Sequence, residues 1–248
     1  MKKQVLVRLA LLLFAVGCVL PAVAQNFDET KWGKNTAGVE LRAVEVSRQP
    51  STSGTVLTYN LIGTGFPANE KYSVWGWVVG RKPEKEIEGV SFDSKGMVVC
   101  SGKPGFCTGK SPNDAINIQT TAVLAEPKRF AVLSDDGKVG AFAEAIPFPI
   151  EATDKNCKVA IVRESPMSEV VQVRATGFVP YEMLNVTGHV GEQEQHHSPT
   201  ASPEGTWGAV IGTKAPGETS GVATIKVTGQ QCSVTVSFKW GEDSTDAQ

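Results

Sequence analysis

Residues 63–78 read GTGFPANEKYSVWGWV, and residues 175–190 read ATGFVPYEMLNVTGHV. Seven of these sixteen aligned positions are identical without a gap, including a Thr-Gly-Phe triplet and a Val-x-Gly-x-Val alternation. Residues 55–62 and 169–175, which precede the two segments, are rich in β-branched side chains. A strand, a glycine turn and a second strand therefore recur, which predicts two copies of one β unit.

The remainder of the chain also favours short strands. The tetrapeptide Ser134-Asp135-Asp136-Gly137 separates two β-rich runs and is a strong hairpin turn. No 3.6-residue apolar period is sustained after residue 24. The sequence therefore predicts an all-β fold of two tandem immunoglobulin-like β-sandwich domains, at residues 39–152 and 157–241. Residues 25–38 and 242–248 are expected to form a flexible segment and a disordered tail.

The pattern G-T-G-F-x-x-x-E-x-x-x-V resembles the strand–turn–strand signature of IPT/TIG-like and related bacterial immunoglobulin-like repeats. The resemblance covers the two motif regions, about a third of the chain after residue 24. It implies the fold, and it implies a role as an extracellular spacer, an adhesion module or an appendage of a surface enzyme. Residues 81–126 depart from the pattern as a long insertion.

Residues 1–24 have the features of a secretory signal peptide. Lys2, Lys3 and Arg8 form a positive start before an apolar run over residues 9–20, and Ala22-Val23-Ala24 provides a small-residue cleavage site. The alternative is a lipid anchor through Cys18, because residues 15–18 resemble a lipoprotein cleavage box. No later stretch has the roughly 20 apolar residues of a membrane span. The prediction is an exported protein, periplasmic or extracellular, without a transmembrane segment.

Net charge and cysteine content further restrict the class of protein to which this chain can belong. The sequence has 24 basic and 26 acidic residues, a net charge of −2, which disfavours binding to nucleic acid. Four cysteines follow the leader, and an even number in an exported chain predicts disulfides. We expect Cys157–Cys232, which would join the first and last strands of the second domain, and Cys100–Cys107, which would close a short loop.

Signatures of catalysis and cofactor binding are weak. The sequence contains neither G-x-S-x-G nor H-E-x-x-H. Residues 63–68 match G-x-G-x-x-A, but a β-rich segment follows where a dinucleotide site needs a helix. The imidazoles of His189, His196 and His197 are weak metal candidates, because the stretch 191–198 reads as a solvated hairpin loop. We therefore expect neither an enzyme, nor a bound metal, nor a cofactor.

Strand alternation makes Trp75 and Trp77 the candidate binding residues. Tyr72, Val74, Gly76 and Val78 share one parity and are predicted to face the core, which places both indoles on the opposite face. The second copy has Thr and His at these two positions, so the fold itself does not require Trp. Three environments remain possible for the two indoles. Residues 81–126 could cover them, the second domain could bury them, or they could form an open platform for a glycan or an envelope protein.

The predicted function is a non-enzymatic binding or adhesion module at the bacterial cell envelope. A structural spacer of a surface assembly is the alternative, and a weak hydrolase or a metal-binding protein is less favoured. The ligand and the oligomeric state do not follow from the sequence.

Overall fold

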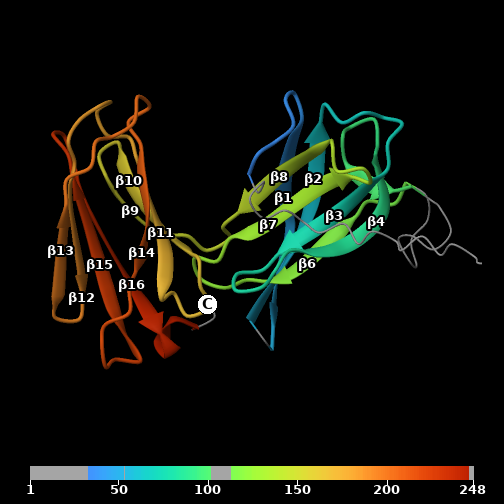
Figure 1. The fold of residues 1–248 in the computed structure, drawn as a ribbon. Coiled ribbons are helices and arrows are strands. Elements are labelled where there is room, and N and C mark those ends of the chain that lie inside the picture. Colours follow the sequence, from blue (N-terminus) through green and yellow to red (C-terminus); the bar gives the residue numbers. More distant parts are fainter. Residues whose placement is uncertain (1–32, 53, 102–112, 246–248) are drawn as a thin grey trace, which may run out of the picture.

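The computed structural model describes residues 33–52, 54–101 and 113–245. Within these ranges the chain forms four antiparallel sheets and one short 3-10 helix, arranged as two β-sandwich domains (Figure 1). The predicted all-β class is confirmed. The described residues include no helix long and apolar enough to cross a membrane. The predicted signal peptide and Cys18 lie outside the described residues.

Domain 1 packs a three-stranded sheet against a five-stranded sheet. The first has the order β1 (Glu40–Ser51), β2 (Gly54–Thr64) and β6 (Asn117–Thr121). The second has the order β5 (Val98–Cys100), β4 (Glu84–Phe92), β3 (Tyr72–Trp77), β7 (Lys128–Ser134) and β8 (Gly140–Ala145). Alternate apolar side chains of β2 pack on those of β3 and β7, and this cluster is the core: Leu57, Tyr59, Leu61, Tyr72, Val74 and Val132. The departing stretch 81–126 thus contributes strands to both sheets.

Domain 2 consists of two four-stranded sheets. One has the order β14 (Trp207–Gly212), β11 (Val170–Thr176), β10 (Cys157–Arg163) and β9 (Ile150–Asp154). The other has the order β13 (Gln193–His197), β12 (Asn185–Val190), β15 (Ser220–Thr228) and β16 (Ser233–Gly241). The expected Cys157–Cys232 disulfide is present, with a Cα–Cα distance of 6.3 Å. Strand β9 begins before residue 157 and pairs with β10, so it belongs to this domain.

The repeated motif has the same backbone geometry in both domains. Gly65 and Gly177 follow β2 and β11 with φ values of 76° and 81°. A Cβ atom would lie 1.9 Å from the carbonyl oxygen of Gly38 at the first position and of Asn156 at the second. Only glycine fits this close approach in the left-handed region, which explains why the glycine of the Thr-Gly-Phe triplet recurs.

Both expected flexible ends are partly ordered. The Asn35 side chain accepts a hydrogen bond from the Phe142 amide, and the Thr36 amide donates to the Gly140 carbonyl, so this segment lies along β8. At the other end, the 3-10 helix η2 (Glu242–Thr245) follows β16, and its Ser244 is buried. Residues at both ends of the described chain are therefore held against the fold, by hydrogen bonds at one end and by burial at the other.

Candidate functional site

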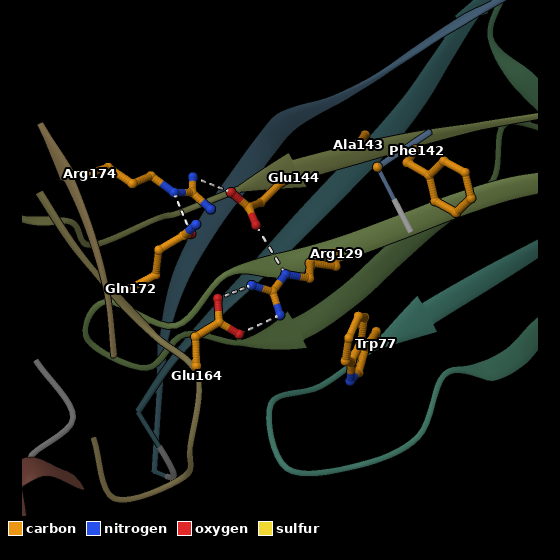
Figure 2. Close-up of a pocket in the computed structure, with 9 residues that line it drawn as sticks. Trp77, Arg129, Phe142, Ala143, Glu144, Glu164, Gln172 and Arg174 are labelled. Atoms are coloured by element: carbon orange, nitrogen blue, oxygen red, sulfur yellow. Dashed lines mark hydrogen bonds and ion pairs between the residues drawn. The ribbon is translucent and has the colours of Figure 1, made fainter. Parts of the chain in front are cut away.

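A cluster of four charged side chains lies where the two domains meet. Figure 2 shows Arg129 between two carboxylates, Glu144 of its own domain and Glu164 of domain 2. Strand pairing places Arg129 and Glu144 directly opposite each other on β7 and β8. Glu164 directly follows β10, and Arg174 lies on β11. These residues line a groove of about 540 Å³.

Arginine and glutamate side chains alternate at this junction, and each one is hydrogen-bonded to a side chain of opposite charge. Arg129 donates two hydrogen bonds to the Glu164 carboxylate, at 2.5 and 3.1 Å, and its Nε donates to Glu144 Oε2 at 3.0 Å. The other Glu144 oxygen, Oε1, accepts from Arg174 Nη1 at 2.6 Å. Two arginines thus neutralise two carboxylates, and the bidentate pair joins domain 1 to domain 2.

The pKa of Glu144 opposes acid–base chemistry. Desolvation raises the pKa of Glu144, but hydrogen bonds from Arg174 and Arg129 and their charges outweigh it, so the pKa lies below its ordinary value. A general acid near neutral pH needs the opposite shift. Glu144 is therefore an ionised structural partner.

The two tryptophans do not form an open platform. Trp75 is 5% exposed, and Lys85 Nζ lies 5.5 Å from its ring centre. Trp77 is half-buried, and the Arg129 guanidinium lies 5.0 Å from its ring centre. Because Glu164 holds that guanidinium from the other domain, Trp77 belongs to the junction. The predicted faces are wrong at Val78, which is 45% exposed because β3 ends at Trp77 and alternation stops there.

Further contacts hold the junction. The Arg163 amide donates to the Ala125 carbonyl across the domain boundary at 2.8 Å. The buried Arg163 side chain donates to the carbonyls of Pro166 and Ser244, so it ties the last turn to the same region. A Cβ atom on Gly80 would lie 2.5 Å from the Pro166 ring, which shows how closely the turn after β3 approaches domain 2.

Both ends of the described chain lie at this junction. Gly33 lines the groove beside Arg129 and Glu164. Ser244 is bound by Arg163, and the Gly241 amide donates to the Met167 carbonyl in the turn after β10. The described chain therefore begins and ends beside the contact between the two domains.

The three histidines do not share one face of the sheet: His189 and His196 lie on one face, and His197 lies on the other. Residues 193–197 form β13 rather than the expected loop, because they pair with β12. On one face, Glu194 Oε1 lies 3.0 Å from His196 Nε2 and 3.6 Å from His189 Nε2, whereas His197 lines a groove on the other face. Among the described residues, no three His, Cys, Asp or Glu side chains are grouped as a metal site.

The predicted Cys100–Cys107 bond cannot be placed, since Cys107 lies outside the described residues. Cys100 itself is buried in the core of domain 1, at the end of β5. This pairing stays a prediction.

No family model matches the sequence, and no curated protein sequence is similar to it. Three solved structures are distantly similar in fold. A tetra-tandem repeat from the extending region of a large adhesion protein has a TM-score of 0.28 at 12% identity, covering 83% of this chain and 50% of that one. A 1.5-MDa bacterial ice-binding adhesin structure has a TM-score of 0.22 at 11% identity, covering 83% and 65%. Red sea bream transglutaminase has a TM-score of 0.26 at 10% identity, covering 86% and 32%. The chain thus spans half the length of the first of these structures and less than two thirds of the others.

Proposed function

We propose that this protein is an exported, non-enzymatic binding module of the bacterial cell envelope. In this proposal the junction holds two β-sandwich domains at a fixed angle and presents their outer edges and tips to a ligand. The disulfide Cys157–Cys232 supports export, because such bonds persist in oxidising compartments.

The observation that carries the proposal is the position of the chain ends. Gly33 lines the groove at the junction, and the Ser244 carbonyl accepts a hydrogen bond from Arg163 in the same region. In this proposal the surfaces away from the junction are the ones that meet the ligand. A spacer that transmits length or force along both domains needs its chain to enter at one tip and leave at the other. This geometry therefore favours presentation of a surface over the spacer alternative.

The chemistry of the junction supports a non-catalytic role. Its carboxylates are paired with arginines at 2.5–3.1 Å, and the indole of Trp77 lies against one of those arginines. Groups that are already paired in this way stabilise an interface, and they offer a substrate neither a free nucleophile nor a proton donor.

Sedimentation with isolated bacterial envelopes tests the proposal. Fluorescently labelled protein, residues 25–248, is mixed with cell-wall and outer-membrane fractions, with and without excess unlabelled protein. We expect saturable retention on at least one fraction that the unlabelled protein competes away. Retention that stays linear with concentration, or label that stays in the supernatant with every fraction, would overturn the proposal.

A further inference from the structure

We propose that an open groove in domain 2 binds a neutral saccharide. This inference rests on the proposed binding function and names its ligand class. The groove has a volume of about 480 Å³ and lies between β13 and β14, the edge strands of the two sheets. That volume is within the range of about 300–1,000 Å³ that is usual for small-ligand sites.

One wall and the floor of the groove are apolar. The half-buried indole of Trp207 and the side chain of Ile211 form the wall on β14. The floor is lined by Val173, Val186 and Ile225, which belong to the buried core of domain 2. An aromatic ring beside aliphatic groups provides a flat surface for the C–H face of a sugar ring.

The opposite wall is polar and its hydrogen-bonding capacity is unused. It consists of the Gln195 amide, the His197 imidazole and the Ser198 hydroxyl. Among the described residues, none of these three side chains has a hydrogen-bond partner. Together they provide donors and acceptors that match sugar hydroxyls.

The groove also lacks the groups that would select a charged ligand. The described residues that line it include no Asp, Glu, Lys or Arg. An acidic sugar or a phosphate would enter without a cation to pair with, at a desolvation cost. A neutral ligand that is apolar on one face and rich in hydroxyls at its edge matches both walls.

Gly188 keeps the groove open at an energetic cost. A Cβ atom there would meet only Ile225 Cδ1, at an ordinary contact distance of 3.4 Å, so the backbone permits a larger residue. Glycine inside a strand is destabilising by about 0.5–1 kcal/mol relative to alanine. At Gly76, the equivalent position of domain 1, the Glu86 side chain lies 3.0–3.5 Å from the same Cβ position and fills the space. The opening is thus specific to domain 2.

Gly188→Val is the principal test, because it should fill the groove and favour the strand. The matched control is Gly212→Val on β14, where a Cβ atom would meet nothing within 4 Å and which does not line the groove. The probes are immobilised cellohexaose, chitohexaose, maltohexaose and mannohexaose, with polygalacturonate as the anionic comparison. We expect the wild-type chain to bind at least one neutral probe and Gly188→Val to lose at least tenfold in affinity with an unchanged or raised melting temperature. Gly212→Val should bind like the wild type.

The polar wall is tested independently by Gln195→Ala and His197→Ala on the exposed strand β13. Each should weaken binding about fivefold, as expected for one lost hydrogen bond. Saccharide binding that Gly188→Val leaves unchanged would place the site elsewhere and overturn the inference. Saturable envelope retention without binding to any neutral probe would overturn the saccharide and leave the binding function standing. Preferential capture of an alternating Val-Thr peptide would likewise replace the saccharide with strand addition at the open edges.

Discussion

Replacing Glu164 with Gln should loosen the junction without unfolding either domain. The change keeps the size of the side chain but removes the negative charge that Arg129 holds with two hydrogen bonds. Glu164 directly follows β10 and is not part of either domain core. The substitution therefore acts on the contact between the domains.

The magnitude follows from the geometry. A hydrogen bond to a charged group contributes about 1.5–3 kcal/mol, and the side-chain amide that replaces the carboxylate would retain one neutral acceptor. Orphaning a fully buried charge would cost about 3–5 kcal/mol, but here Glu144 still neutralises Arg129. The Glu164 side chain is also 25% exposed, so water screens part of the loss. We expect the junction to open about 2 kcal/mol more easily, which is roughly a 30-fold change in the opening equilibrium.

Hydrogen exchange at one amide measures this equilibrium directly. The Arg163 amide donates to the Ala125 carbonyl across the junction, so it exchanges when the junction opens. In Glu164→Gln its exchange rate should rise about 30-fold. The Thr213 amide, which donates to Glu169 within domain 2, should keep its rate.

Glu169→Gln is the matched control. Glu169 pairs with Lys214 at 3.1 Å within domain 2, and the two side chains are 32% and 62% exposed, so the loss should stay at about 1 kcal/mol or less. The reasoning is refuted if the Arg163 amide exchanges at the wild-type rate in Glu164→Gln. It is equally refuted if Glu169→Gln accelerates that amide as much, or if Thr213 accelerates in parallel.

Three other predictions concern stability. Replacing Cys157 and Cys232 by Ser should lower the free energy of unfolding of domain 2 by about 4 kcal/mol, because the bond closes a separation of 75 residues; guanidinium titration checks this, and an unchanged midpoint contradicts it. Trp75→Ala should cost about 3–5 kcal/mol because the indole is buried, and Trp77→Ala about 1–2 kcal/mol because its ring is half-buried under a guanidinium; thermal melts that rank them in reverse would refute the assignment. Since the folded pKa of Glu144 lies below the unfolded value of about 4.3, its stabilisation is complete above that pH and is lost as the pH falls through the folded pKa; Glu144→Gln should flatten this acid limb of a denaturation series.

The fold was predictable because its deciding signals are local. The glycines at 65 and 177 specify the same tight turn, and the tetrapeptide 134–137 does join β7 to β8. Strand β13 was missed because all five of its residues are polar or charged and exposed. An edge strand with one face in solvent and the other on an open groove has no apolar alternation to detect.

The junction could not be read from the sequence. Arg129, Glu144, Glu164 and Arg174 belong to different strands or their ends, and each one alone looks like an ordinary surface charge. Only the packing of two domains brings them within hydrogen-bond distance. Alternation correctly placed Tyr72 and Val74 in the core, but it describes one strand and not the layers that cover it.

The two copies use the same strand for different purposes. On β3, the outward positions hold Trp75 and Trp77, and the second of these packs on the arginine that bridges the domains. On β12, the equivalent positions hold Thr187 and His189, and this face remains accessible, with the His189 side chain 49% exposed. Trp77 is therefore a requirement of the junction, whereas the buried Trp75 contributes to the stability of domain 1. On β12 the proposed groove lies on the opposite face, which carries Val186 and Gly188.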